Sequence, residues 1–345
     1  MTTADTIIAL ELGHYRLREQ IGGSAYGIIW RASGPQTTSD VAIKLINQEQ
    51  MTRALPAQRD RWTASAHNEI AFLQSLEPWD ERHIVRLLDS GWHDGLPVLA
   101  LELMGCDLGK HMVALKGRGE RLPLARALGW IAQINQALAK VHQYGWRYLD
   151  LKPANVLLDP HLNTVKLADF GTNRELGSLA AHSYAGTANW QAPEQFFPAD
   201  GGGYATGARS DYFSLGAMLY FLVTSGTPLR FGAECGQAYR EHHMAGADLL
   251  RSRNGGAIPS ALHAEEEEHF AGAIPPDQRD AALALLRTLL HIDPARRPCH
   301  AIQISRMLNA ILGMKSARGA LDAADPVLAM HRPSSVNGWQ AMQAP

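Results

Sequence analysis

Three polar residues in the stretch WRYLDLKPANVLL (146–158) have types and spacing suited to chemistry on phosphate. Asp150 could accept a hydroxyl proton, Lys152 could steady a transferring phosphoryl group, and Asn155 could bind a metal through its side-chain oxygen. The apolar residues that follow indicate a loop that leads into a strand. The spacing predicts a site for phosphoryl transfer, a reaction that depends on positioning and charge neutralisation.

A second acidic residue follows at the end of another apolar run. The segment VKLADFG (165–171) carries Asp169 at the point where a hydrophobic strand should give way to a glycine turn. A carboxylate there offers a second oxygen ligand for magnesium. This order of residues is too specific to be explained by chance.

Three upstream features are weaker when taken singly. The small-residue segment 21–29 (IGGSAYGII) could let backbone approach phosphate, but ordinary hairpin turns look the same. Lys44 ends VAIK on an expected strand and could point inward or into solvent. Glu69 shares a helix face with Leu73, so it is either a partner for a buried lysine or a surface acid.

Between residues 15 and 104 the sequence predicts a small β-rich half. Short runs rich in β-branched residues alternate with brief links, which is typical of an antiparallel sheet. One helix is expected in this half, over residues 57–76. The expected strands are 15–22, 26–32, 40–46, 84–92 and 96–103.

From residue 105 to 312 the periodicity is that of helices. Apolar residues recur at intervals of three and four at Leu124, Leu128, Ile131, Ile134, Leu138 and Val141. The run 211–226 is apolar nearly all round and predicts a helix buried in the centre of a large lobe. Further helices are expected over 279–291 and 301–312. We therefore expect an α+β, two-lobed protein with an N-terminal extension (1–14) and a loosely ordered C-terminal tail (313–345).

Bulk composition excludes several classes of protein. Of 345 residues, 46% are hydrophobic and 19% are charged, as in soluble globular proteins, and the formal net charge of −2 does not favour nucleic acid or an anionic membrane as partner. The chain has no apolar run of about 18 residues, so no membrane segment is expected. Three sparse cysteines argue against a disulfide framework and a zinc site, and fit a cytoplasmic location.

Two segments of the chain are insertions relative to these expected strands and helices. Residues 47–60 extend the approach to the first helix, and residues 230–275 include the acidic run HAEEEEHF (263–270). Such a run is most often a solvated helix face, and the alternative is a docking surface for a basic partner. We expect a regulatory partner, if there is one, to act through 230–275 or through the tail.

Taken in order, these motifs resemble those of the eukaryotic-type (Hanks-type) serine/threonine protein kinases. The family's order is followed by VAIK, DLKPAN, DFG, GTANWQAPE (186–194), SDYFSLG (210–216) and DPARRP (293–298). The resemblance runs from about residue 15 to residue 312. It implies the bilobal kinase fold, with ATP and Mg²⁺ (alternatively Mn²⁺) as cofactors. It also implies transfer of the γ-phosphate to Ser or Thr of protein substrates, including autophosphorylation.

The resemblance also implies a role for each matching residue. Asp150 would be the catalytic base beside Lys152, and Asn155 and Asp169 would hold the metal. Lys44 would contact the α- and β-phosphates and pair with Glu69. The nucleotide would be enclosed by the glycine-loop residues Ile21, Gly22, Gly23, Ser24 and Gly27, by Ile29, Ala42 and Leu157 around adenine, by Leu101 behind it, by Glu102 and the backbone of Met104 at the lobe junction, and by Asp107 at the ribose. Structural roles would fall to a Glu194–Arg297 ion pair and to Asp211 beneath the catalytic loop.

The sequence departs from the family pattern at three positions. Ser24 stands where the second loop glycine belongs, which predicts weaker ATP affinity. Tyr148 replaces the usual histidine and should pack on Phe170, with Leu73 and Leu87 continuing the stack. Leu149 replaces the arginine that usually binds a phosphate on the activation loop, so control by phosphorylation of residues 172–193 should be weak or absent.

Several alternatives stay open. Ser178, Ser183, Tyr184 and Thr187 are hydroxyls of that loop, and Thr187 should bond to Asp150 and Lys152 rather than serve as a required phosphosite. The altered loop residues leave a pseudokinase scaffold as the rival function, with a small-molecule kinase as a third. The compact chain, its alanine-rich composition and the missing membrane segment suggest a soluble bacterial member of the family. Cys106, near the expected nucleotide rim, is either reactive or simply a small, partly buried residue.

Overall fold

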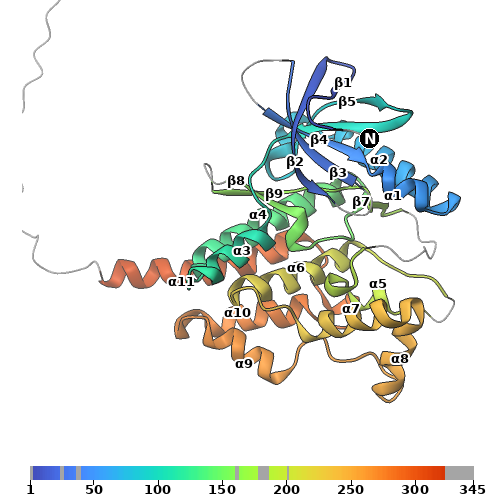
Figure 1. The fold of residues 1–345 in the computed structure, drawn as a ribbon. Coiled ribbons are helices and arrows are strands. Elements are labelled where there is room, and N and C mark those ends of the chain that lie inside the picture. Colours follow the sequence, from blue (N-terminus) through green and yellow to red (C-terminus); the bar gives the residue numbers. More distant parts are fainter. Residues whose placement is uncertain are drawn as a thin grey trace, which may run out of the picture.

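The computed structural model describes residues 3–23, 27–35, 40–159, 163–177, 186–199 and 202–322, with side chains described up to residue 313. A β-sheet lobe lies above a larger helical lobe, and the chain passes between them after β6 (Figure 1). The predicted two-lobed α+β fold is confirmed.

The small lobe is built on one six-stranded sheet in which every neighbouring pair is antiparallel. Its order is β1-β2-β3-β4-β6-β5. The strands are β1 (Ile7–Ala9), β2 (His14–Gly23), β3 (Gly27–Ser33), β4 (Asp40–Ile46), β5 (Leu87–His93) and β6 (Leu96–Glu102).

One expected strand start was wrong. The sheet strand β5 begins at Leu87 rather than at residue 84. Ile84 instead forms a bridge with Leu167 of the large lobe, and the Val85 amide donates to the Leu167 carbonyl at 2.8 Å. Residues 84–85 therefore join the lobes, because their apolar side chains are buried at the interface rather than in the sheet.

The N-terminal segment is part of the small lobe. β1 pairs with β2, and Ile8 is fully buried. The carboxylate of Asp89 accepts hydrogen bonds from the Leu12 amide at 2.9 Å and from the Tyr15 hydroxyl at 3.0 Å. Burial and Asp89 together raise the pKa of Tyr15 to about 12. The expected boundary at residue 15 leaves this strand outside the lobe that it completes.

The helix predicted over 57–76 is α2 (Pro56–Ser75). Glu69, Phe72 and Leu73 are its buried residues, so one turn of its C-terminal half meets the core. The insertion before it forms a short helix, α1 (Gln48–Arg53), which begins where the Asn47 side chain accepts from the Gln50 amide. Proline at the first position of α2 starts the second helix without losing a hydrogen bond.

The large lobe is helical, as predicted. Its helices are α3 (Leu108–Gly117), α4 (Leu124–Gln143), α5 (Pro193–Phe196), α6 (Ala208–Val223), α7 (Arg230–His242), α8 (Gly246–Arg253), α9 (Ala264–Gly272), α10 (Pro276–Leu289) and α11 (Ala301–Asp322). Two small sheets also form, from β7 (Trp146–Arg147) with β10 (Arg174–Glu175), and from β8 (Val156–Asp159) with β9 (Thr164–Leu167).

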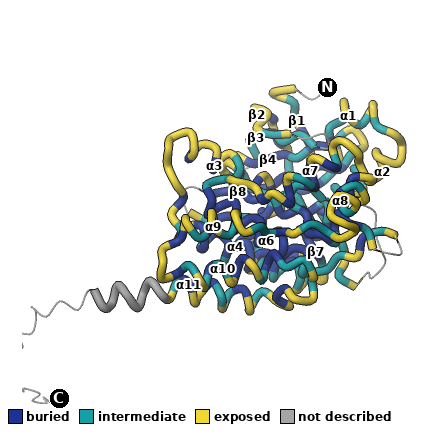
Figure 2. Tube along the Cα trace, turned by 90° about the horizontal axis from the view of Figure 1, so that it is seen from below, coloured by how far each residue is buried: buried dark blue, intermediate teal, exposed yellow. Residues whose placement is uncertain are grey.

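The apolar helix predicted over 211–226 lies at the centre of this lobe. Every residue of α6 from Ser210 to Val223 is buried. Figure 2 shows α4 and α6 as the dark interior, with exposed segments around the rim. A helix without a polar face needs neighbours on all sides, so α6 forms the centre of the lobe on which the site is built.

Two segments differ from their expected description. α11 continues to Asp322, past the expected helix end at 312. The acidic run lies in α9, where Glu267 pairs with Arg287 at 2.6 Å and Glu266 accepts from the Arg230 amide at 2.8 Å. Acids in the first turn also complement the helix dipole, so half of this run holds the lobe together rather than facing solvent alone.

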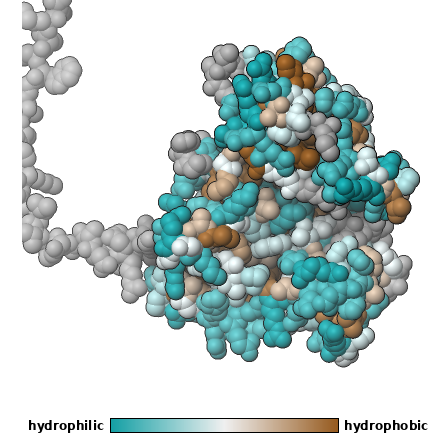
Figure 3. Space-filling model, viewed as in Figure 1, coloured by the Kyte–Doolittle hydropathy of each residue, from teal (hydrophilic) through white to brown (hydrophobic). Residues whose placement is uncertain are grey.

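The face of the molecule in Figure 3 is mostly hydrophilic, with small separate hydrophobic spots. Among the described residues, none of the helices combines the length and apolarity needed to cross a membrane. All three cysteines are free thiols, and Cys106 is exposed.

Candidate active site

The loop that carries Asp150 is held from below by a fully buried carboxylate. Asp211, near the start of α6, accepts from the Tyr148 amide at 2.9 Å and from the Leu149 amide at 2.7 Å. The Gln195 side chain donates to the Leu149 carbonyl at 2.9 Å. Leu149 has a φ of 66°, a left-handed conformation that costs a non-glycine residue about 1–3 kcal/mol. These hydrogen bonds hold the strained turn, and the predicted supporting position of Asp211 is confirmed.

Four side chains meet at the end of this turn. Lys152 Nζ lies 2.7 Å from Asp150 Oδ2, and Thr187 Oγ1 donates to Asp150 Oδ1 at 2.7 Å. Asn155 Nδ2 donates to Asp150 Oδ2 at 3.0 Å, and Lys152 also donates to Thr187 at 2.9 Å. The predicted contacts of Thr187 are present, and Asp150 is fixed on both carboxylate oxygens.

Burial has a chemical consequence for Asp150. Only 6% of the residue is exposed, and this burial raises the pKa of its carboxyl above the ordinary value, while Lys152 acts in the opposite direction. A carboxylate with a raised pKa is a stronger base than one in water. Asp150 is therefore suited to accept a proton from a hydroxyl group.

A second charged cluster joins the two lobes. Lys44 of β4 lies 2.6 Å from Glu69 of α2 and 2.8 Å from Asp169, which follows β9. Burial disfavours the ammonium, but the carboxylates of Asp169 and Glu69 outweigh it and raise the pKa of Lys44. Lys44 in turn lowers the pKa of Asp169, whereas burial raises that of Glu69. The predicted Lys44–Glu69 pair is present.

Aromatic side chains connect these two clusters. Tyr148 is fully buried, packs edge-on against Phe170 at 5.2 Å, and donates its hydroxyl to the Ala168 carbonyl. Phe170 stacks in turn on Phe72 of α2 at 4.7 Å. The expected contact of Tyr148 with Phe170 is confirmed. Phe72 was not predicted, while Leu73 and Leu87 belong to the same apolar cluster.

The residues expected around adenine lie on facing strands and at the lobe junction. Ile29 is opposite Lys44 across β3 and β4, and Ala42 is opposite Leu101 across β4 and β6. Below the junction, Leu157 of β8 forms a bridge with Asp107. Met104 lies between Leu101 and Asp107 in the chain. It is half-buried and packs against the core.

Two acids of this group already have partners in the structure. The carboxylate of Glu102 lies 2.5 Å from Lys166 of β9 and 2.8 Å from the Arg86 amide. Its carboxylate is therefore committed to the lobe junction, so adenine recognition by Glu102 would fall to its backbone. Asp107 caps α3 by accepting from the Lys110 amide at 2.9 Å, which leaves less of this carboxylate for a ribose.

The glycine loop is described on both sides of its tip. Gly22 and Gly23 on β2 lie opposite Ile29 and Ile28 on β3, Gly27 begins β3, and Ile21 is 37% exposed. Ser24 lies outside the described residues, as do Ser178, Ser183 and Tyr184. The hairpin itself agrees with the sequence prediction.

Comparison with known proteins identifies this arrangement. Residues 15–309 match the family model described as protein kinase domain. The chain belongs to the protein kinase family. A rice protein (Oryza sativa subsp. japonica) named cyclin-dependent kinase F-4 is 28% identical over 214 residues, which is 62% of this chain and 42% of the rice protein. The kinase thus aligns with less than half of that relative's length.

The large-lobe ion pair expected in this kinase is present. Arg297 donates to both carboxylate oxygens of Glu194, at 2.7 and 2.9 Å, and its side chain is fully buried. Arg297 also bonds to the carbonyls of His291, Ile292 and Arg209. A buried guanidinium needs this number of partners, which makes the pair an anchor for the segment after Thr187.

The donor set near Asp150 fits Mg²⁺ bound together with a nucleotide. Asn155 commits its amide nitrogen to Asp150, which leaves the carbonyl oxygen as its metal-binding atom, and 47% of the Asp169 side chain is exposed. Among the described residues, no group of three His, Cys, Asp or Glu converges on one point. Two oxygen ligands are what Mg²⁺ commonly takes from a protein when phosphates and water supply the rest.

Sequence reasoning missed three residues of the site. Gln195 clamps Leu149, Phe72 extends the aromatic stack, and Lys166 binds Glu102. Phe72 lies next to Leu73 in an apolar stripe and could have been named with it. No local pattern marks Gln195 or Lys166, because their partners lie 46 and 64 residues away in the chain.

Proposed function

We propose that this kinase transfers the γ-phosphate of ATP to serine or threonine hydroxyls of protein substrates, including its own. The observation that carries the proposal is the bonded set of Asp150, Lys152, Asn155 and Thr187, together with the Lys44–Asp169 contact. A scaffold without turnover would not need each of these groups in bonding distance. Lys152 and Thr187 are also the residues by which this chain resembles serine/threonine rather than tyrosine kinases.

The residues would divide the work as follows. When bound, Mg-ATP supplies the transferable phosphoryl group. Asp150 accepts the proton of the attacking hydroxyl, and Thr187 holds its second oxygen so that the carboxylate keeps one orientation. Lys152, 2.7 Å from Asp150, places a positive charge where the equatorial phosphate oxygens gain charge.

The nucleotide would be held between the lobes. Lys44 would contact the α- and β-phosphates, oriented by Glu69, with the metal held by Asn155 and Asp169. The adenine would lie between Ile29 and Ala42 above and Leu157 below. Mn²⁺ would be able to replace Mg²⁺. Because Ser24 replaces a loop glycine, Ser24→Gly should tighten ATP binding, and unchanged or weaker nucleotide binding by this variant would count against that assignment.

We further propose that activity does not depend on a phosphorylated activation loop. Leu149 is 2% exposed, carries no charge, and its backbone is already bonded on both sides. The turn is thus held without a charge that would need a phosphate as partner. Treatment with phosphatase followed by re-assay tests this: full activity is expected, and a collapse of activity would contradict it.

The decisive experiment incubates the protein with labelled ATP and Mg²⁺. Wild type should label protein on Ser or Thr, while Asp150→Ala and Asp169→Ala should lose roughly 10²- to 10⁴-fold in rate. Asp280→Ala, an exposed acid of α10, is the matched control and should match wild type. Absence of label in wild type, with nucleotide still bound, would favour the rival pseudokinase function. Label on small molecules alone would favour a small-molecule kinase.

The same proposal places the protein in the cytoplasm, with a regulatory partner acting through residues 230–275 or through the tail. Exposed acids Glu265 and Glu268 of α9 remain available to such a partner, since Glu266 and Glu267 are bonded within the lobe. Loss of binding to a cognate regulator in a Glu265→Lys, Glu268→Lys variant, with basal activity kept, is the expected result.

A further inference from the structure

The helix α7 and the 3₁₀ turn η3 (Ala188–Trp190) approach each other unusually closely. A Cβ atom added to Gly232 would lie 2.2 Å from the carbonyl oxygen of Asn189, and one added to Gly236 would lie 2.0 Å from Asn189 Oδ1. Real Cβ atoms essentially never come within 3.0 Å of another heavy atom. The contact therefore exists only because both helix positions are glycine.

Backbone conformation does not explain these glycines. Neither Gly232 nor Gly236 is among the residues with positive φ, and both lie inside α7. Glycine weakens a helix interior relative to alanine, because it loses more conformational freedom on folding. An alanine at either position would collide with Asn189 where it now lies, so the glycines allow this close approach.

The turn that α7 touches is bound directly to the catalytic residues. Thr187, the residue before η3, bonds to Asp150 at 2.7 Å and to Lys152 at 2.9 Å. At the other end of the turn, the Trp190 carbonyl accepts from Ser214 of α6 at 2.8 Å. Residues 187–190 are thus fixed at both ends, and α7 packs against their middle.

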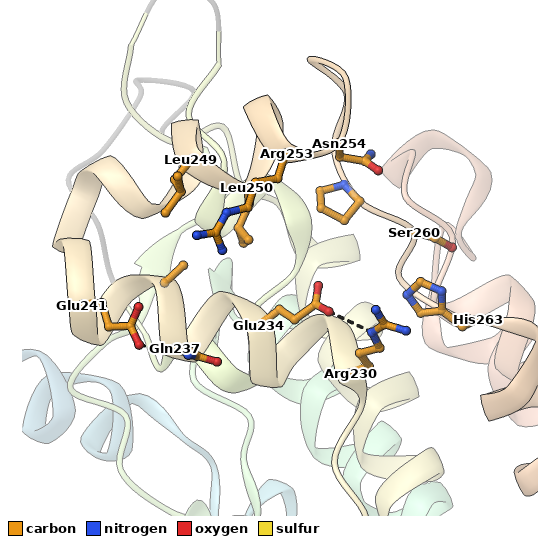
Figure 4. Close-up of a pocket in the computed structure, with 12 residues that line it drawn as sticks. Arg230, Glu234, Gln237, Glu241, Leu249, Leu250, Arg253, Asn254, Ser260 and His263 are labelled. Carbon is orange, nitrogen blue, oxygen red and sulfur yellow. Dashed lines mark hydrogen bonds and ion pairs between the residues drawn. The ribbon is translucent and has the colours of Figure 1, made fainter.

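The opposite face of α7 has a different character. Arg230 bonds to Glu234 at 2.8 Å and Gln237 bonds to Glu241 at 2.9 Å, so this face is a row of polar pairs one turn apart. These side chains face a cavity of about 470 Å³ beneath α8 and the segment 254–263 (Figure 4). Leu249 and Leu250 of α8 line the same cavity, so α7 is also packed against α8. On the side that meets η3, Phe231 and Cys235 are buried beside the two glycines.

We propose that α7 is a positioning element of the active site, in which Gly232 and Gly236 act through Asn189 to set where Thr187 meets Asp150 and Lys152. This inference rests on the proposed phosphotransfer. It assigns a catalytic consequence to a helix whose own residues touch neither phosphate nor metal. Displacement of the turn by less than 1 Å would move Thr187 out of hydrogen-bonding range of Asp150, and misplacements of this size can cost about 100-fold in rate.

The test uses steric complementation. Gly232→Ala should lower kcat for phosphorylation of dephosphorylated casein by roughly 10- to 100-fold, because its added Cβ meets the Asn189 carbonyl and the backbone of the turn must move. The KM for ATP should change little, because the nucleotide residues do not move. Gly236→Ala meets only the Asn189 side chain, so it should cost less than Gly232→Ala. Asn189→Ala removes the obstructing Oδ1, so the double variant Gly236→Ala, Asn189→Ala should recover most of the loss. Gly232→Ala should not be rescued by Asn189→Ala, because its obstacle is a backbone carbonyl. Gly129→Ala in α4 has open space around the added methyl group and serves as the matched control.

A readout without turnover separates this proposal from the proposed function. Amide hydrogen exchange at residues 186–190 should speed up in Gly232→Ala, whether or not the protein phosphorylates anything. It should speed up less in Gly236→Ala and return toward wild type in the double variant. If wild type shows no phosphotransfer, the proposed function is contradicted. Hydrogen exchange in the variants would then still show whether α7 sets the position of η3. Unchanged exchange and activity in Gly232→Ala, or a loss of kcat in Gly236→Ala that Asn189→Ala fails to restore, would overturn the positioning role of α7.

Discussion

The two charged clusters of the site are held in different ways. The catalytic loop is fixed inside one lobe, where Asp211 and Gln195 bond to the backbone of Tyr148 and Leu149. The Lys44 cluster draws its three members from β4, α2 and the end of β9, and only charge and short contacts join them across the lobes. The first cluster is part of the folded core, while the second exists only when the lobes are in place.

This difference explains why Leu149 is compatible with an intact site. In the loop, the groups that hold the backbone are Asp211 and Gln195, and the Leu149 side chain contributes no polar contact. A missing arginine there removes a charge but none of the bonds that shape the turn. Activity should therefore be most sensitive to changes at the lobe interface, in Lys44 and the carboxylates of Glu69 and Asp169.

Among the variants that compare the two clusters, Lys44→Met should have the largest effect. Phosphotransfer should fall by about 10²- to 10³-fold, because one positioned cation is lost. Glu69 would then be buried without its partner, and burial already raises the pKa of Glu69. An acid with a raised pKa in the folded state destabilises the fold as pH rises above its unfolded value of about 4.3, so this variant should lose stability from pH 4 towards 7.

Thermal or urea unfolding at several pH values measures this. Lys166→Met, which removes a lysine from the Glu102 contact at the junction, is a useful comparison because it leaves Glu69 paired. If the free energy of unfolding of Lys44→Met depends on pH in the same way as that of wild type, Glu69 is not held by Lys44 alone.

Asp211→Asn should act on the other cluster and chiefly on stability. One carboxylate oxygen becomes a donor facing a backbone amide, which leaves a buried group unsatisfied at a cost of about 1–3 kcal/mol, and the strained Leu149 turn loses its support. Urea unfolding should show the loss, with Asp280→Asn as the exposed control. Stability equal to wild type would mean that the turn is held by Gln195.

A smaller effect is expected from charge beside the base. Burial raises the pKa of Asp150 and Lys152 lowers it, so Lys152→Met should raise that pKa further. Asp150 works as a base only when it is ionised, so the acidic limb of the kcat/KM profile should move to higher pH in this variant. Lys152→Arg keeps the charge and should leave the limb near its wild-type position. A shift towards lower pH would contradict the assignment of Asp150 as the base.

The smallest effect on activity is expected from Leu149→Arg. A buried position with 2% exposure receives an unpaired charge, so stability should fall by about 3–5 kcal/mol, while activity of the folded protein should stay within about threefold of wild type. Leu149→Met, which conserves volume, should cost less. If Leu149→Arg instead gains activity that phosphatase removes, the activation loop can still be controlled by phosphate once an arginine is supplied.

Much of this kinase follows from local sequence. Asp150, Lys152 and Asn155 stand at offsets that a single loop fixes, so their meeting at one point could be predicted from spacing. Helices α4 and α6 and the sheet strands follow from periodicity, because the burial of one face or of all faces is encoded residue by residue. Even the absence of an arginine before Asp150 was visible without coordinates.

Only the tertiary structure decided how distant groups meet. Residues 7–9 were expected to be an extension, yet they pair with β2 and bury Ile8, and Asp89, far along the chain, bonds to Leu12 and Tyr15 beside them. The carboxylate of Glu102 pairs with Lys166, and the lack of side chains at Gly232 and Gly236 lets Asn189 lie close to α7. Each of these contacts depends on two segments that approach through the whole fold, and local spacing carries no information about such an approach.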